Sequence, residues 1–218
     1  MSGPFTRVGN MSQPNPDPTA QAVFGDRLPI AKAYHESLAT VAAARGFIGP
    51  KEVDRLWSRH LLNCAVISEA FDEGLDVADI GSGAGLPGIP LAIARPDLSV
   101  TLIEPLLKRS TYLTEVVDEL GLSNVTVVRG RAEEQSSSLF DVVTSRAVAP
   151  LGKLAGWSLP LVKPGGAMIA MKGESVAEEL ERDAEEIRRA KGGKAEIFTV
   201  GDGLLEQTTT LIRIPRTR

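Results

Sequence analysis

The chain has 218 residues, of which 43% are hydrophobic and 24% are charged, and its formal net charge is −4. This length and composition allow one well-buried globular domain and exclude a fibrous or largely disordered chain. The acidic balance argues against a protein that coats nucleic acid by general electrostatics, although it permits a local basic face.

Two further features bear on location and metal binding. No stretch approaches the roughly 20 apolar residues that span a bilayer, and the N-terminus lacks the basic and apolar segments of a signal peptide. We therefore expect a cytoplasmic protein without membrane contact. Cys64 is the single cysteine, so an internal disulfide is excluded and no metal site is expected. We interpret it as a small apolar residue on a helix face.

The first third of the chain predicts a leader and a helical cap. Residues 1–19 are polar and contain four prolines, so we expect a flexible leader. Residues 20–74 predict a helical N-terminal cap with one helix ending at Gly46 and a second from Lys51 to Phe71, closed by Gly74. The apolar face of the first helix comprises Leu28, Tyr34, Leu38 and Val41.

Residues 75–218 alternate short β-type runs with helical segments, which is typical of a parallel sheet with crossover helices. The predicted strands are Leu75–Ile80, Ser99–Ile103, Val125–Val128, Asp141–Thr144 and Ala167–Met171, followed by an antiparallel pair at Ala195–Val200 and Thr208–Ile214. The predicted helices are Leu86–Ala94, Leu106–Leu120, Leu151–Leu161 and Glu174–Ala190. The pattern indicates an α/β, doubly wound, mainly parallel seven-stranded, Rossmann-like sheet, and the terminal pair favours a methyltransferase sheet.

A glycine-rich turn follows the first predicted strand. Residues 79–88 read DIGSGAGLPG, directly before a helix. A pyrophosphate loop needs a third glycine where this chain has Leu86, and Pro87 removes a backbone donor nearby. The spacing therefore suits a phosphate-free ligand, such as an adenosine with an amino-acid tail whose ammonium Asp79 would meet. A purely structural turn is the alternative.

Two later acidic positions fit the same ligand. Glu104 ends the second strand, where a carboxylate meets a ribose diol in such folds. Residues 130–133, GRAE, follow the third strand, where the adenine edge would lie. The alternatives are an acid at a helix N-terminus for Glu104 and a solvated helix start for residues 130–133.

The end of the fourth strand limits the chemistry. It reads TSRAVA over residues 144–149, without the polar-Pro-Pro-aromatic loop that serves methylation of exocyclic amines. Methylation at a pyrimidine carbon needs a thiolate, and Cys64 lies far upstream on a predicted helix. The remaining route is transfer to an atom with a lone pair, such as guanine N7, which needs positioning and no base.

Together these motifs resemble the glucose-inhibited division protein B (RsmG) family, the 16S ribosomal RNA guanine-N7 methyltransferases. The resemblance runs from about Phe24 to Lys172. It is carried by WSRH at residues 57–60, DIGSGAGLPGIPLAIARPD from Asp79, LIE at residues 102–104, NVTVVRGRAEE, FDVVTSRAVAPL and GGAMIAMKG. It implies a class I S-adenosylmethionine-dependent fold with a small helical cap, S-adenosylmethionine as cofactor and 16S rRNA within the small ribosomal subunit as substrate.

The residues and the resemblance together assign the site. The expected cofactor-binding residues are Asp79, Gly81, Ser82, Gly83, Gly85, Leu86, Glu104, Ala132, Glu133 and Arg146. The expected RNA-binding residues are Arg59, His60, Arg146 and Lys172, with Arg146 and Lys172 as catalytic candidates. Many relatives have an acid where this chain has Asn63, so the resemblance assigns no role to that position.

Each of these positions has a structural alternative. Arg59 could form a surface ion pair, His60 could be a packed or capping histidine, and Lys172 could be a solvated lysine at a strand end. We interpret Trp57 as a core residue rather than a base-stacking platform.

Other functions compete with this assignment. They are transfer to another RNA or a small molecule, a nicotinamide-dependent oxidoreductase, and a protein that binds S-adenosylmethionine or RNA without transferring a methyl group. We expect a monomer that methylates a structured ribosomal particle better than naked RNA.

Overall fold

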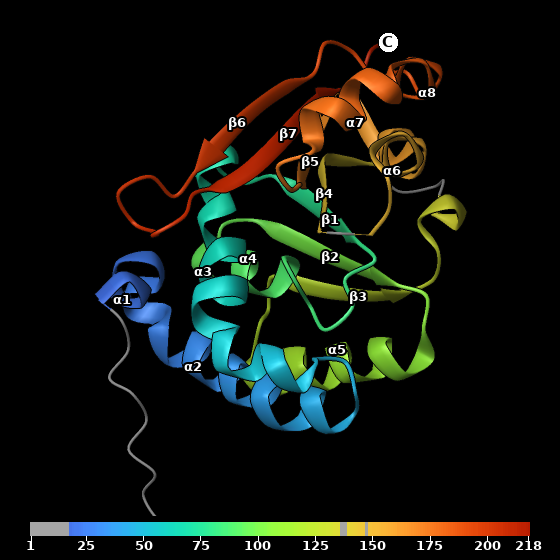
Figure 1. Cartoon of the computed structure of the whole chain (residues 1–218). Coiled ribbons are helices and arrows are strands. Elements are labelled where there is room, and N and C mark those ends of the chain that lie inside the picture. The colour runs from blue at the N-terminus through green and yellow to red at the C-terminus, as the bar shows by residue number, and fades with distance from the viewer. Residues whose placement is uncertain (1–17, 136–138, 147) are drawn as a thin grey trace, which may run out of the picture.

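The computed structural model describes residues 18–135, 139–146 and 148–218. Their strands form one seven-stranded sheet with the order β3-β2-β1-β4-β5-β7-β6 (Figure 1). The strands are β1 Asp76–Ile80, β2 Ser99–Glu104, β3 Val125–Arg129, β4 Phe140–Arg146, β5 Val162–Met171, β6 Glu196–Val200 and β7 Thr209–Pro215. Strands β1 to β5 are parallel, and β7 is antiparallel to both β5 and β6. The predicted doubly wound sheet is confirmed.

Helices cover both faces of this sheet (Figure 1). They are α1 Pro18–Phe24, α2 Leu28–Ser37, α3 Leu62–Ala65, α4 Gly88–Ala94, α5 Leu107–Leu120, α6 Leu151–Ser158, α7 Val176–Arg182 and α8 Ala184–Arg189. Val77 and Ala78 are neighbours in β1 but belong to different apolar clusters, because successive strand residues point to opposite faces. The first cluster joins the sheet to α1–α5, and the second joins it to α6–α8. Within the described residues no helix has the length and apolarity to cross a bilayer.

The region before β1 is helical, as predicted, but it is not two regular helices. Single turns of 3₁₀ and π geometry interrupt it at Gly25–Arg27, Leu38–Ala42, Pro50–Arg55, Leu56–Leu61 and Val66–Ala70. The prediction that Val41 lies on the buried face is wrong, because Val41 is 38% exposed whereas Ala42 is fully buried. The wider π turn at Leu38–Ala42 changes the angular spacing of side chains and so rotates the apolar face by one position.

Other element boundaries also differ from prediction. The expected helix Glu174–Ala190 is two helices, because the chain breaks at Asp183. The buried carboxylate of Asp183 accepts a hydrogen bond from Gly152 N at 2.9 Å, which ties the break to the start of α6. Most of the expected leader, residues 1–17, lies outside the described residues, whereas Pro18 and Thr19 belong to α1.

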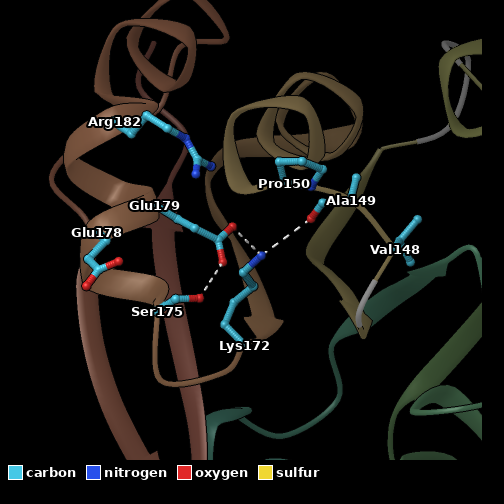
Figure 2. A pocket seen from close by; sticks show the side chains of 8 residues that line it. All are labelled: Val148, Ala149, Pro150, Lys172, Ser175, Glu178, Glu179 and Arg182. Carbon is cyan, nitrogen blue, oxygen red and sulfur yellow. Dashed lines mark hydrogen bonds and ion pairs between the residues drawn. The ribbon is translucent and has the colours of Figure 1, made fainter.

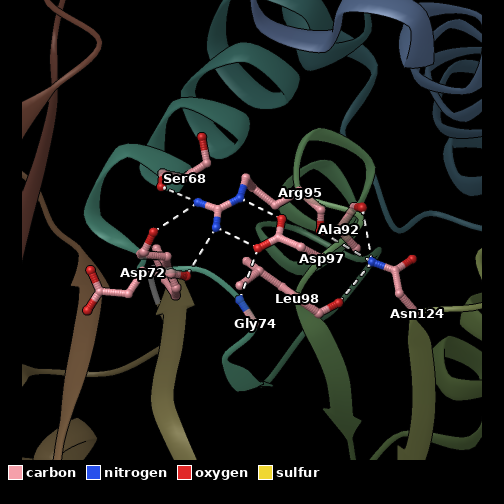
Figure 3. A network of polar contacts seen from close by, with 9 residues as sticks. Ser68, Asp72, Gly74, Ala92, Arg95, Asp97, Leu98 and Asn124 are labelled. Carbon is pink, nitrogen blue, oxygen red and sulfur yellow. Dashed lines mark hydrogen bonds and ion pairs between the residues drawn. The ribbon is translucent and has the colours of Figure 1, made fainter.

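A polar network ties the cap to the sheet at the amino-terminal ends of the strands (Figure 3). Arg95 follows α4 and donates to the carbonyl oxygens of Ser68 at 3.2 Å and Phe71 at 2.9 Å, while its other nitrogens contact the carboxylate of Asp97. Asp97 in turn accepts from Gly74 N at 3.1 Å. A doubly wound fold places its ligand at the carboxyl ends of the strands. These contacts fix the sheet at the opposite edge.

Candidate functional site

The glycine-rich turn after β1 leaves no room for a side chain at two of its glycines, Gly85 and Gly88. Gly85 has a φ of +101°, and a Cβ there would lie 2.9 Å from the hydroxyl oxygen of Tyr34. A Cβ on Gly88 would overlap the side chain of Leu102 and lie 2.8 Å from Asp79 Oδ2. Both glycines are therefore required by close packing, since real Cβ atoms do not approach other atoms so closely.

Two buried carboxylates hold the backbone of this turn. Asp79 is fully buried, and its Oδ2 accepts a hydrogen bond from Gly88 N at 3.0 Å. Burial raises the pKa of Asp79 to about 7, and its Oδ1 has no hydrogen-bond partner among the described residues. Glu104 is 2% exposed and accepts from Gly83 N and Leu106 N, each at 2.9 Å. Both acids thus support the turn, and their contacts with a ligand ammonium or ribose stay predictions.

Three more side chains contact or belong to this turn. Tyr34 in α2 is fully buried and donates its hydroxyl to Ala84 O at 2.8 Å. Ser82 donates to Asp79 O at 2.8 Å, so its hydroxyl is also directed into the turn. Leu86 belongs to the apolar core and is absent from the lining of the cavity described next. Tyr34 was predicted only as an apolar face residue, although a buried tyrosine hydroxyl usually requires a partner.

An apolar crevice of about 230 Å³ lies at the carboxyl ends of β1, β2 and β3. The predicted residues Gly81, Ala132 and Glu133 line it. Val148 and Trp157, which the sequence did not single out, line it as well. Lys153 places its Nζ 4.9 Å from the centre of the Trp157 ring, which fixes that indole by a cation–π contact. We call this cavity the adenosine crevice, because an apolar slot with few polar groups suits a nucleoside.

A larger and more polar groove of about 800 Å³ lies beside the ends of β4, β5 and β7. The predicted residues Arg59, Arg146 and Lys172 line it together, although they come from distant segments. Glu174 and Glu206 line it too, so the groove carries both signs of charge. We call this the acceptor groove.

His60 is not part of the groove lining but lies behind it. Its Nδ1 is 2.8 Å from Nη1 of Arg146, and its Nε2 is 2.8 Å from Glu52 Oε2. Cys64 is fully buried, as predicted, and its Sγ lies 3.8 Å from the same nitrogen of Arg146. Burial raises the pKa of Cys64 to about 11, so the thiol stays protonated near neutral pH and cannot act as a nucleophile.

Lys172 is held more tightly than a solvated lysine (Figure 2). Its side chain is 8% exposed, and Nζ lies 2.6 Å from Glu179 Oε2 in α7 and 3.4 Å from Ala149 O. Figure 2 shows this ion pair at a further cavity of about 430 Å³ between α7 and the segment after β4. The alternative of a solvated strand-end lysine is therefore wrong, because this side chain is largely buried and paired with Glu179.

Trp57 packs inside the cap, as predicted. Its ring stacks on His35 with centroids 5.0 Å apart and meets Phe24 edge-to-face at 6.4 Å. The acceptor groove has no aromatic side chain among its described lining residues. The described residues also contain no group of three or more His, Cys, Asp or Glu placed to hold a metal ion.

Comparison with known proteins gives consistent matches. Residues 27–207 match the GidB family model, described as rRNA small subunit methyltransferase G. The chain is 69% identical over 203 residues to the ribosomal RNA small subunit methyltransferase G of Corynebacterium glutamicum, covering 91% of each chain. It is 54% identical over 200 residues to that of Thermobifida fusca, covering 91% of this chain and 84% of the relative.

Solved structures show the fold at much lower identity. The S-adenosylmethionine-dependent methyltransferase SibL in its apo form matches with a TM-score of 0.59 and 19% identity, covering 90% of this chain and 74% of that one. M. jannaschii TYW2 in complex with AdoMet matches with a TM-score of 0.57 and 18% identity, covering 73% of this chain and 76% of that one.

Proposed function

The chain belongs to the rRNA small subunit methyltransferase G family, and on that premise we propose that it methylates N7 of a guanine in 16S ribosomal RNA, with S-adenosylmethionine as donor. The acceptor belongs to the small ribosomal subunit. The protein acts in the cytoplasm as a monomer. A structured particle is a better acceptor than naked RNA, because the chain has a net charge of −4 and cannot hold RNA by charge alone.

One observation carries the choice of cofactor. From Gly85 to Leu91 every backbone N–H group already donates to an acceptor within the chain, and that of Gly88 donates to Asp79. Pro87 and Pro90 have no N–H group. A pyrophosphate bound at a helix N-terminus needs free N–H groups there. The turn therefore disfavours a nicotinamide dinucleotide and fits a nucleoside without phosphates.

The proposed roles follow from this placement. The adenosine is held by Gly81, Ala132 and Glu133. Asp79 meets the ammonium of the amino-acid tail, and Glu104 meets the ribose. The turn that carries these contacts is shaped by the other predicted cofactor residues, Ser82, Gly83, Gly85 and Leu86. Arg59, His60, Arg146 and Lys172 serve the RNA side of the site, where Arg146 and Lys172 grip a phosphate of the acceptor or the carboxylate of the cofactor.

The chemistry requires position rather than a base. S-adenosylmethionine supplies a methyl group on a sulfonium, and the lone pair of N7 displaces the thioether without release of a proton. The side chains of the groove bind phosphate and orient the guanine, because the product base is cationic and would be repelled by arginines packed on its ring.

The decisive experiment uses small subunits from a strain that lacks the gene. We expect label from methyl-labelled S-adenosylmethionine to enter 16S rRNA at one guanine, identified by cleavage specific for N7-methylguanine. If the protein binds the cofactor but no label enters RNA, it is a binding protein and not a methyltransferase. If the label enters another RNA or a small molecule, that molecule is the acceptor instead of 16S rRNA. A rise in melting temperature with S-adenosylhomocysteine, and none with NADH, would exclude the alternative of a nicotinamide-dependent oxidoreductase.

A further inference from the structure

A line of side chains runs from the acceptor groove to the surface of the cap. Arg146 stands at the end of β4, His60 lies in the π turn Leu56–Leu61, and Glu52 lies in the 3₁₀ turn Pro50–Arg55. The two contacts, Nη1 to Nδ1 and Nε2 to Oε2, are each 2.8 Å long. Glu52 lines neither the crevice nor the groove.

The chemistry of the groups sets the direction of both hydrogen bonds. A guanidinium can only donate, so Nδ1 of His60 accepts from Arg146. The imidazole must then carry its proton on Nε2, which donates to the carboxylate of Glu52. Burial, reinforced by the charge of Arg146, lowers the pKa of His60, and this favours the same neutral form. The tautomer is thus fixed from both sides.

Arg146 is held on one side only. Its Nη1 faces His60 and the Sγ of Cys64, whereas Nε and Nη2 have no hydrogen-bond partner in the described ranges. A free arginine side chain loses rotamer entropy when a ligand orders it. Holding Nη1 in advance reduces that loss and leaves the other donors for an anionic group in the groove.

We propose that Glu52 and His60 are positioning residues, which orient the guanidinium of Arg146 toward the RNA acceptor and so connect Glu52 of the cap to the methyltransferase site. This inference rests on the proposed acceptor-side role of Arg146. It assigns the cap a function in transfer besides covering the sheet.

The test compares variants of His60 and Glu52 on small subunits. His60→Phe removes both hydrogen bonds, and we expect kcat/KM to fall about 10- to 100-fold, as for a misplaced contact group. His60→Asn keeps an oxygen near the position of Nδ1 and should retain activity within about 5-fold. Glu52→Gln keeps an acceptor for Nε2 without the charge and should lie between them. Asp54→Asn, in the same turn and exposed, changes the same charge and should behave as wild type.

A pH profile separates positioning from a structural role. The charged groups around His60 are Glu52, Arg59 and Arg146, and Arg55 adds to the field at Glu52. Protonating Nδ1 turns the acceptor of Arg146 into a donor, so wild-type activity should fall on the acid side of pH 6.5, whereas His60→Asn should lack that fall. Affinity for S-adenosylhomocysteine should stay unchanged in every variant.

The outcomes distinguish this inference from the proposed function. Full activity of His60→Phe beside an inactive Arg146→Ala would overturn the positioning role alone, and so would an equal loss of cofactor affinity. Full activity of Arg146→Ala would remove the premise itself. If His60→Phe is unfolded by urea titration, the difference in pH profile between His60→Asn and wild type decides.

Discussion

The adenosine crevice and the acceptor groove are built by different means. The crevice lies against the glycine-rich turn, in which the backbone N–H groups of Gly83 and Gly88 donate to the buried carboxylates of Glu104 and Asp79. The groove owes its shape to side chains held by other side chains, as in the contacts of Arg146 with His60 and of Lys172 with Glu179. The first wall is fixed by the main chain, whereas the second can be rearranged by rotamer changes or by protonation.

This difference suits two kinds of ligand. A cofactor of constant shape is best met by a rigid turn, and an RNA acceptor has to be both gripped and released. The groove also places Glu174 and Glu206 beside its three cations. The mixture limits unspecific attraction to phosphate, which agrees with the acidic charge of the whole chain.

The largest expected effect breaks the rigid side of the comparison. In Gly88→Ala the new methyl group overlaps Leu102 and crowds Asp79, both of which are fully buried and cannot move away. We expect the free energy of unfolding to fall by about 3 kcal/mol and binding of S-adenosylhomocysteine to be lost in calorimetry. Gly156→Ala is the control, because Gly156 lies exposed in α6 with nothing near its Cβ. It should be neutral or stabilising by up to about 1 kcal/mol, and an equal loss in both variants would contradict the packing argument.

The second prediction concerns the pH dependence of the turn. Because burial raises the pKa of Asp79 from 3.8 to about 7, the folded chain binds a proton that the unfolded chain has lost between these values. The free energy of unfolding therefore falls as pH rises through this window. Asp79→Asn cannot titrate and keeps an acceptor for Gly88 N. We measure the free energy of unfolding of variant and wild type by urea titration at both pH values. The value for the variant minus that for wild type should be about 2 to 3 kcal/mol larger at pH 7.5 than at pH 4.5. Parallel curves would mean that Asp79 is ionised throughout.

The third prediction tests the side-chain wall of the groove. Lys172→Met leaves Glu179 without its partner in a site where the two side chains are 8% and 14% exposed. We expect a loss of about 1 to 3 kcal/mol in urea unfolding, below the range for a fully buried pair. In Lys172→Met/Glu179→Met the stability should return in part, because no charge is left unpaired although Leu151 N, which donates to Glu179 Oε2 at 3.0 Å, loses its acceptor. Methyl transfer should stay low in the double variant if Lys172 contacts the acceptor, and recovered transfer would assign Lys172 a structural role only.

Sequence alone predicted the parts of the molecule that depend on local pattern. The apolar runs gave all seven strands within a few residues, except that β5 begins at Val162 rather than Ala167. The glycine spacing located the turn, because close backbone packing needs glycine at particular positions. Gly81, Ala132 and Glu133 line the crevice because each follows the carboxyl end of a strand, which the apolar runs also located.

The remaining features depend on contacts between distant segments. Trp157 reaches the crevice from α6, and Tyr34 reaches Ala84 across 50 residues, which no periodicity indicates. The π turn that buries Ala42 in place of Val41 has no clear sequence signature. The break at Asp183 likewise follows from its bond to Gly152 rather than from local helix preference.

The smallest effect sharpens the comparison at a single hydrogen bond. Tyr34→Phe removes the buried bond from the hydroxyl to Ala84 O, and Tyr112→Phe removes a bond of similar length to Ser37 Oγ, at 3.0 Å and away from the turn. Each variant should lose about 1 kcal/mol in the free energy of unfolding. Only Tyr34→Phe should also weaken S-adenosylhomocysteine binding, by about 2- to 5-fold in calorimetry, because Ala84 belongs to the glycine turn. Equal affinities in the two variants would show that the turn is held by its carboxylates alone.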